Sequence, residues 1–184
     1  MDKEILLKSI EEKFGNIVNQ VSEPHNFLTL EVDPDKLKPL IKFLKDDETC
    51  NFVFLTDICG VHYPSNKEKE FAVVYHLHNW EANFRLRLKT FVNRENISLP
   101  TISDIYSGAN WMERETFDFF GIIFTGHPKM IRILNMEDMD YHPMRKEYPM
   151  EDATRTDKDD RFFGRDGNSS VKFDNRKSIA RDNG

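Results

Sequence analysis

The sequence has few of the groups that proteins use to carry electrons or to bind nucleotides. Its 184 residues include only two cysteines, Cys50 and Cys59, whereas an iron–sulfur cluster takes about four thiolates. The stretch NFVFLTDI between them reads as a strand, which would hold them about 25–30 Å apart, and a disulfide needs Cα atoms within about 7 Å. The eight glycines form neither GxGxxG nor GxxxxGK. We therefore expect two free thiols and no iron–sulfur cluster or dinucleotide site.

Signals of several other protein classes are missing as well. There is no GxSxG, no HExxH and no paired CxxC. No run approaches the roughly 18 apolar residues that cross a bilayer. The net charge of −6 argues against nucleic acid and against binding an anionic membrane by charge alone. The first residues, MDKEILLKSIEEKFGN, read as an acidic helix rather than a signal or transit peptide. We expect a cytosolic or equivalent compartment.

Hydrophobic periodicity predicts two helices in the first third of the chain. The first covers residues 3–14, and its apolar stripe has four members: Ile5, Leu6, Ile10 and Phe14. The second follows Asp33, which suits an N-cap, and Pro34, which suits the first helical position. Pro39 lies inside this second helix and should kink it or trim its start.

Alternating patterns predict the strands. We expect strands at residues 26–32, 52–57, 71–77 and 84–89. In the last of these, apolar residues alternate with Arg85, Arg87 and Lys89, so that one face meets the core and the other meets water or a partner. A helix over 110–120 should follow. Asn110 and Glu113 have the spacing of a capping-box variant, and Gly121 is its expected stop.

This element order indicates an α+β fold with a mixed sheet of about four strands packed with helices. We divide the chain into an α+β domain (1–125), an extension (126–150) and an extended, charged C-terminal arm (151–184). The arm has charges of both signs and no sustained period, so it cannot build a core of its own. Either it is a flexible terminus or, as we favour, it lies along a partner and uses its phenylalanines as anchors.

Four histidines are candidates for chemistry. His76 and His78 are two residues apart on a predicted strand, so they share a face and could hold a metal. A zinc site needs a third or fourth ligand, and none is near in sequence, so two sheet-face histidines are the favoured interpretation. His127 and His142 each adjoin a proline, where shaping a turn or hydrogen bonding is favoured over proton transfer.

The stretch WMERETFDFFGIIFTGHP concentrates acids among aromatic rings. It contains Glu113, Glu115 and Asp118, together with Arg114, which is four residues from Asp118 on the same helix. Glu113 points with apolar residues, and a buried carboxylate needs a cationic partner or a change of protonation. The candidate cations are Lys129, Arg132, Arg145 and Lys146. We favour a structural ion network that ties the helix to the following segment over a catalytic acid pair.

Two segments resemble a known family. ERETFDFFGIIFTGHPKMIRIL (113–134) and HPMRKEYPM (142–150), with DICGVHYP (57–64), are similar to the 30 kDa subunit of respiratory complex I. In bacteria this is the C subunit of the proton-translocating NADH–quinone oxidoreductase. The matching positions, with a signature or interface role, are Glu113, Arg114, Glu115, Asp118, Gly121, Gly126, His127, Pro128, Arg132, Pro143, Arg145, Lys146 and Pro149. The sequence departs from the pattern at Ile131, Tyr141 and Glu147, which weakens the expected ion pairing.

The resemblance implies a non-redox structural and assembly subunit in the peripheral arm of that enzyme. It implies no catalytic activity and no cofactor or metal in this chain, with FMN and iron–sulfur clusters held by partner subunits. The implied partners are the 49 kDa-type (D) subunit and the cluster-bearing B and I subunits, and no nucleic acid. Membrane association would be indirect, at the cytoplasmic face of a bacterial inner membrane.

Two alternatives stay open at this point. The same structural role could belong to a related hydrogenase or a ferredoxin-fed quinone reductase. A free-standing metal-dependent hydrolase would use His76, His78 and an acid, and would bind zinc.

Overall fold

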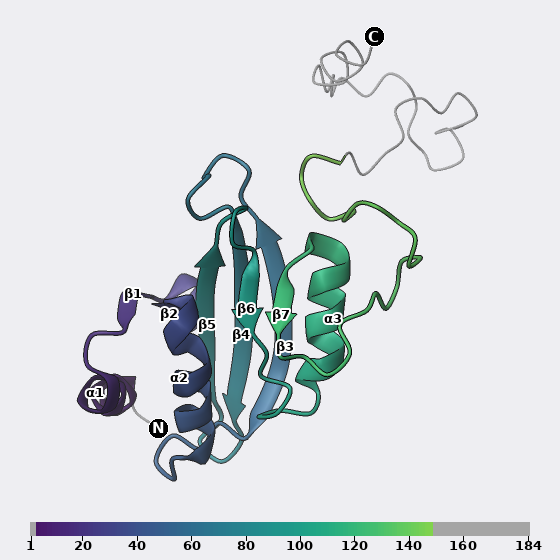
Figure 1. Cartoon of the computed structure of the whole chain (residues 1–184). Coiled ribbons are helices and arrows are strands. Elements are labelled where there is room, and N and C mark those ends of the chain that lie inside the picture. Colours follow the sequence, from purple (N-terminus) through teal and green to yellow (C-terminus); the bar gives the residue numbers. More distant parts are fainter. Residues whose placement is uncertain (1–2, 149–184) are drawn as a thin grey trace, which may run out of the picture. The chain divides into compact units, whose positions relative to one another are not determined.

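The computed structural model describes residues 3–148. The predicted helices and strands occur in the predicted order, and short elements that were not predicted lie between and after them (Figure 1). The predicted arm, residues 151–184, and the signature residue Pro149 lie outside the described residues, so both expectations stay predictions.

A five-stranded mixed sheet forms the centre of the fold. Its order is β1-β2-β5-β4-β3, built from β1 (Val18–Ser22), β2 (Leu28–Val32), β3 (Phe54–His62), β4 (Phe71–Asn79) and β5 (Phe84–Val92). Within this sheet β2 and β5 run parallel, and the other neighbours run antiparallel. The α+β class and the mixed sheet are confirmed. Within this sheet the strand missed from sequence is β1, whose sequence VNQVS is largely exposed and lacks a clear apolar alternation; two short strands outside the sheet, at 98–100 and 123–125, were missed as well.

Strand β3 is longer than predicted. It runs from Phe54 to His62, rather than over 52–57, and therefore includes Cys59. Both cysteines are free thiols, as expected, with Cys50 buried and Cys59 half-buried.

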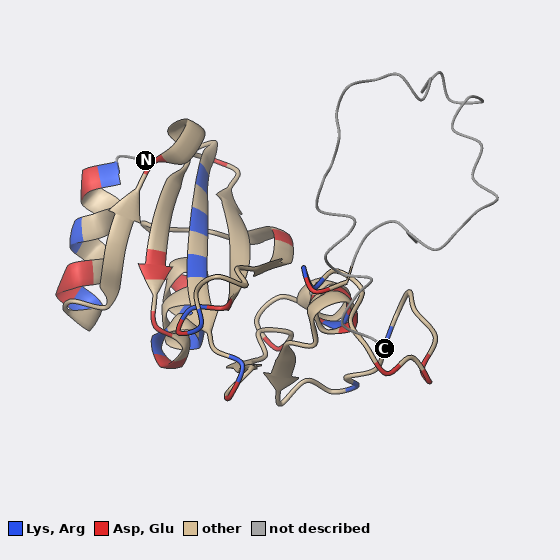
Figure 2. Cartoon of the chain, turned by 90° about the horizontal axis from the view of Figure 1, so that it is seen from above, with Lys and Arg blue, Asp and Glu red and all other residues tan. Residues whose placement is uncertain are grey.

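The predicted hairpin is confirmed as β4 and β5. Tyr75 lies opposite Leu88, and Leu77 lies opposite Leu86. All four side chains are buried, because in a strand every second residue faces the same side. The intervening Arg87 faces the other side of the sheet, opposite His76. In Figure 2 basic residues recur along a strand of the sheet, as the Arg85, Arg87 and Lys89 spacing of β5 requires.

The first two helices differ from prediction in detail. In α1 (Lys3–Phe14), Leu6 and Ile10 are buried but Ile5 is exposed, so the stripe is narrower than expected. Helix α2 (Pro34–Asp46) begins at Pro34 as predicted and continues through Pro39. Asp33 makes no capping bond with its side chain. Its Oδ1 instead accepts from Asn19 Nδ2 at 2.7 Å, which joins β1 to the helix start. A short 3-10 turn, η1 (Pro24–Asn26), links β1 to β2.

Helix α3 (Ala109–Phe120) and a parallel pair, β6 (Ser98–Pro100) and β7 (Ile123–Thr125), complete the fold. They lie on the same side of the sheet as α2 (Figure 1). A Cβ on Gly60 of β3 would lie 2.5 Å from a ring carbon of Phe120, so glycine permits the close contact of α3 with the sheet. The predicted capping box is wrong: Gly108 is the N-cap, with no side-chain cap bond. The stop at Gly121 is confirmed, because this residue is left-handed with φ 75°.

No helix within residues 3–148 is long and apolar enough to cross a membrane.

Candidate functional site

Asp118 connects α3 to the segment that follows β7. The residue is fully buried, and Arg132 Nη1 donates to its Oδ1 at 2.7 Å. Its Oδ2 accepts from three consecutive backbone N–H groups, at 3.1, 2.8 and 2.9 Å: those of Ile133, Leu134 and Asn135. The Asn135 side chain donates to Oδ1 as well. Arg132 is thus the cation, among the candidates, that pairs with an acid of α3.

These contacts keep Asp118 ionised. Burial acts most strongly and would raise the pKa of this carboxyl. The N–H groups of Asn135 and Leu134, and the Arg132 guanidinium, outweigh burial and hold the pKa well below its usual range. Every acceptor position of the carboxylate is used internally, which leaves none for a substrate.

Glu113 is buried in a different environment. Of the two expected outcomes, a cationic partner or a change of protonation, the contacts of this acid favour the second, because no Lys or Arg within residues 3–148 forms an ion pair with it. Instead Thr101 Oγ1 donates to Oε2 and the Ile102 N–H donates to Oε1 at 2.7 Å. Burial raises the pKa of the carboxyl to about 7, and the two hydrogen bonds only partly oppose the shift. Sequence reasoning missed Thr101, which precedes the helix and gave no signal of its own.

His127 Nε2 lies 4.0 Å from Glu113 Oε2. Its Nδ1 accepts from the Lys129 N–H at 3.0 Å, and its Nε2 donates to the Asn110 carbonyl at 3.1 Å. Both ring nitrogens are thus hydrogen-bonded to backbone groups. The hydrogen-bonding role expected for His127 agrees with these contacts. Gly126 precedes it with φ 85°, and Pro128 is exposed.

Arg114 and Glu115 do not form the expected contacts. Arg114 does not pair with Asp118 on its own helix; it donates to the carbonyls of Ile131 and Arg132 at 3.1 and 3.0 Å. Its guanidinium also lies over the Trp111 ring. Glu115 is exposed and has no ion pair within residues 3–148.

Residues 126–148 contain no helix or strand and are held by side chains that bond to backbone. Arg132 Nη2 donates to the carbonyls of Met139 and Tyr141, at 2.6 and 2.9 Å. His142 Nδ1 donates to the Asp118 carbonyl at 3.0 Å, and Arg145 Nε donates to the Phe120 carbonyl at 2.8 Å. The ion network expected here is therefore mostly a network of charged groups bonded to backbone. Pro143 in this segment is half-buried.

Gly121 is required where this segment crosses the end of α3. A Cβ at that position would collide with the Arg145 guanidinium and with the His142 ring. The left-handed backbone of Gly121 also disfavours any side chain.

A third buried acid, Glu70, joins the same segment to the sheet through Arg94, and sequence reasoning missed it. Glu70 accepts from Arg94 through both of its oxygens and lies 3.1 Å from His62 Nε2. Arg94 also pairs with Glu147 at 2.8 Å. His62 Nδ1 accepts from the Lys146 N–H at 2.9 Å, while the Lys146 side chain is exposed. These residues are far apart in sequence, so no spacing could have revealed them.

The outer surface of residues 126–148 carries large apolar side chains. Leu134 and Met136 are 65% and 69% exposed, and their exposed neighbours in sequence are Tyr141, Met144 and Tyr148. Trp111, on α3, is 61% exposed. Concentrated exposed apolar groups are typical of protein interaction surfaces.

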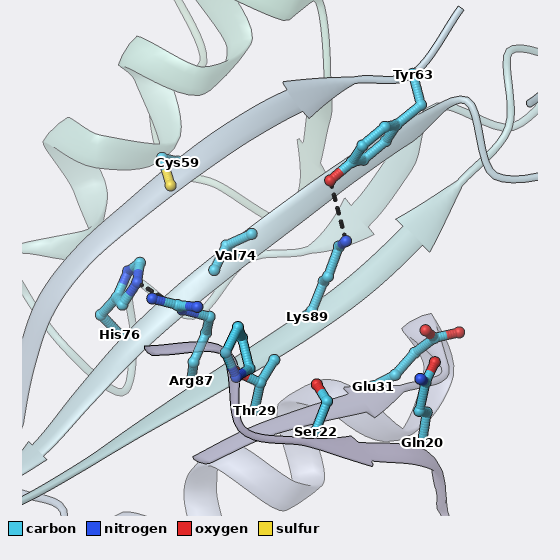
Figure 3. A pocket seen from close by; sticks show the side chains of 11 residues that line it. Gln20, Ser22, Thr29, Glu31, Cys59, Tyr63, Val74, His76, Arg87 and Lys89 are labelled. Atoms are coloured by element: carbon cyan, nitrogen blue, oxygen red, sulfur yellow. Dashed lines mark hydrogen bonds between the residues drawn. The ribbon is translucent and has the colours of Figure 1, made fainter. Parts of the chain in front are cut away.

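The face of the sheet opposite α2 and α3 holds a polar pocket (Figure 3). Arg87 and Lys89 line it from β5, and both have partners: Arg87 Nε donates to His76 Nε2, and Lys89 Nζ donates to the Tyr63 hydroxyl at 3.0 Å. Cys59 also lines the pocket.

His76 and His78 are not brought into a common site. His78 stacks on Trp80, with 5.0 Å between ring centroids, and contacts Asn83. Among the described residues, the one group of three or more potential metal ligands is Asp57, Cys59 and His76, without His78. The metal site of the hydrolase alternative, which combined His76 and His78 with an acid, is therefore wrong.

Comparison with known proteins gives relatives across most of the chain. A family model described as respiratory-chain NADH dehydrogenase, 30 kDa subunit, matches residues 30–154. The NADH-quinone oxidoreductase C subunit from Xanthobacter autotrophicus is 46% identical over 125 residues, which cover 68% of this chain and 59% of that protein. The protein of the same name from Roseiflexus castenholzii is 38% identical over 165 residues, which cover 89% of this chain and 94% of that protein. The chain thus spans less than two thirds of the first relative and nearly all of the second.

Two solved structures have the same fold. A trypsin-resistant fragment of Nqo5 is 30% identical, with a TM-score of 0.59, and covers 70% of this chain and 99% of the fragment. A chain of the membrane-bound sulfane sulfur reductase, an archaeal respiratory membrane complex, is 31% identical, with a TM-score of 0.68. The match covers 80% of this chain and 85% of that chain. By the extent of the family match and the identity to its relatives, this chain belongs to the family of the respiratory-chain NADH dehydrogenase 30 kDa subunit.

Proposed function

We propose that this chain is a structural subunit of the peripheral arm of a complex I-type NADH–quinone oxidoreductase. It supports electron transfer from NADH through FMN and iron–sulfur clusters to quinone, and all of these redox groups belong to partner subunits. The chain itself has no catalytic activity. Its relatives from Xanthobacter and Roseiflexus, both named as the C subunit of NADH-quinone oxidoreductase, support this assignment.

The observation that carries the proposal is that residues 126–148 are held by buried charged contacts and expose large apolar side chains. The charged side chains on the inner side are committed: Asp118 to Arg132 and three backbone N–H groups, and Arg145 to a backbone carbonyl. The outer side leaves Leu134 and Met136 in solvent. A catalytic acid needs a free position facing a substrate, and Asp118 has none. An exposed apolar segment held in a fixed shape suits docking to other subunits.

The partners are the 49 kDa-type (D) subunit and the cluster-bearing B and I subunits. Membrane association is indirect, through these partners, at the cytoplasmic face of a bacterial inner membrane. The net charge of −6 agrees with an indirect association, because anionic lipid would repel the chain.

A second candidate is the same structural role in a related respiratory assembly. The 31% identity to a chain of the archaeal sulfane sulfur reductase complex favours it. The subunits that supply electrons would differ between the two assemblies, so the identity of the co-purified electron donor separates them.

The test is recovery of partners with the tagged full chain from gently solubilised membranes. We expect the cluster-bearing subunits to co-purify, and we expect Leu134→Ser with Met136→Ser to reduce their recovery. Ile5→Ser is the matched control, because Ile5 is also an exposed apolar residue, 52% exposed, but lies on α1. Equal recovery with the double variant and the control would reject this surface. Stoichiometric iron or flavin in the isolated chain would reject the non-redox role.

A further inference from the structure

Three different metal-ligating side chains meet on the face of the sheet opposite α2 and α3. Asp57 of β3 lies opposite His76 of β4 in the antiparallel register. Cys59 is two residues beyond Asp57, so it faces the same side. One ligand atom from each residue lies within 4.8 Å of the other two. Figure 3 shows Cys59 and His76 projecting from these two strands into the pocket.

His76 has one ring nitrogen without a partner. Its Nε2 accepts from Arg87 Nε at 3.1 Å. Its Nδ1 is buried and forms no hydrogen bond within the described part of the chain. Buried polar groups in native proteins nearly always have a partner. The unpaired His76 Nδ1 therefore indicates that this cluster binds a ligand.

We propose that Asp57, Cys59 and His76 bind one zinc ion, with a water molecule from the pocket as the fourth ligand. Zinc accepts thiolate, imidazole and carboxylate ligands together. Its bond lengths place tetrahedral ligand atoms roughly 3.3–3.8 Å apart. The ligand atoms lie within 4.8 Å of one another, so side-chain rotations that bring them about 1 Å closer complete the site.

Zinc binding would take the thiolate form of Cys59, and the thiol proton passes to solvent as the sulfur–zinc bond forms. The Asp57 carboxylate and the thiolate together neutralise the ion.

Arg87 opposes the ion in two ways. It places a positive charge beside the site, and its Nε–H donates to His76 Nε2. When Nδ1 binds the metal, the ring proton must reside on Nε2, which can no longer accept from Arg87. The guanidinium must turn away before zinc binds, so removal of Arg87 should tighten binding.

This site goes beyond the proposed function and does not depend on it. It departs from the expectation of a metal-free chain, but zinc has no redox chemistry, so a subunit without a redox role can hold it. Loss of partner recovery and loss of metal binding are measured separately, and either can fail without the other.

The test is titration of the purified, chelator-treated full chain with Co²⁺, a coloured substitute for Zn²⁺. We expect one Co²⁺ per chain, with tetrahedral visible bands and a thiolate-to-cobalt absorption band, and displacement of Co²⁺ by Zn²⁺. Cys59→Ser should abolish the thiolate band, and His76→Phe should lower affinity tenfold or more. Cys50→Ser is the matched control and should leave the spectrum unchanged, because the other cysteine is buried elsewhere.

Arg87→Gln is a variant for which the proposal predicts tighter metal binding, whereas the other variants should bind more weakly. It should increase Co²⁺ affinity, a result that misfolding cannot imitate. The proposal is overturned if no saturable binding occurs, if the thiolate band persists in Cys59→Ser, or if Arg87→Gln weakens binding. Far-UV circular dichroism checks that each variant is folded before titration.

Discussion

Replacing Glu113 by glutamine removes a buried charge without removing its hydrogen-bonding capacity. The carboxyl is fully buried and accepts from the Ile102 N–H and from Thr101 Oγ1. The glutamine carbonyl can take the Ile102 bond. Its amide can donate to Thr101 Oγ1, because that hydroxyl lies 2.8 Å from Ser103 Oγ and can direct its own proton there.

The size of the effect follows from the shifted pKa. Burial raises the pKa of Glu113 from 4.5 to about 7 in the folded chain. A raised folded-state pKa stabilises the protein fully below the unfolded value, and this stability is lost as the pH rises through about 7. Between about pH 5.5 and 8.5, this linkage removes about 2 kcal/mol from the unfolding free energy of the native chain. Glu113→Gln should not lose this amount.

The assay is urea unfolding of the full chain at about pH 5.5, 7 and 8.5. We expect Glu113→Gln to match the native chain at the lowest pH and to be more stable at the highest. Glu115→Gln is the matched control, because it makes the same change at an exposed position on the same helix. Parallel pH profiles for the native chain and Glu113→Gln would show that the carboxyl is ionised in the fold and that the reasoning is wrong.

Two further predictions concern the contacts of residues 126–148. Asp118→Asn should destabilise the chain by about 3–5 kcal/mol at pH 7, because the amide keeps one acceptor oxygen where the carboxylate has two, so its NH2 group must face either the backbone N–H groups or the Arg132 guanidinium. In urea unfolding, the difference in unfolding free energy between Asp118→Asn and the native chain should shrink as the pH falls. The lowered pKa of Asp118 means that its ionised form stabilises the native chain at neutral pH and that this stabilisation is lost in acid. Arg145→Ala, which loses the bond to the Phe120 carbonyl, should reduce the amount of assembled complex on native gels more than the NADH–quinone turnover per complex; normal assembly with lost turnover would contradict a structural role.

The elements that sequence predicted well are those specified by local patterns. The alternation around Leu86 and Leu88 defined β5, because strand faces repeat every two residues. Gly121 marked the end of α3 for a similarly local reason, its left-handed backbone. Each of these signals lies within a few residues of the structure that it specifies.

The partners of the buried acids could not be predicted in the same way. A cation from the following segment was one of two alternatives expected for Glu113, and its partners instead precede the helix at Thr101 and Ile102. His62 and the Lys146 N–H are bonded across 84 positions. Such contacts depend on how the sheet and α3 pack, and sequence spacing has no information about that packing. The parallel pairing of β2 with β5 was out of reach for the same reason.

The two buried acids of α3 illustrate how position alone separates their roles. Glu113 meets one hydroxyl and one N–H, too few to offset burial, so its carboxyl holds a proton up to about pH 7. Asp118, five residues later, meets three N–H groups and a guanidinium, and remains ionised. A segment without helix or strand must satisfy its backbone through side chains, and Asp118, with Arg132 and Arg145, does so for residues 126–148. The backbone that carries the exposed Leu134 and Met136 is therefore held in place by charged side chains on its other side.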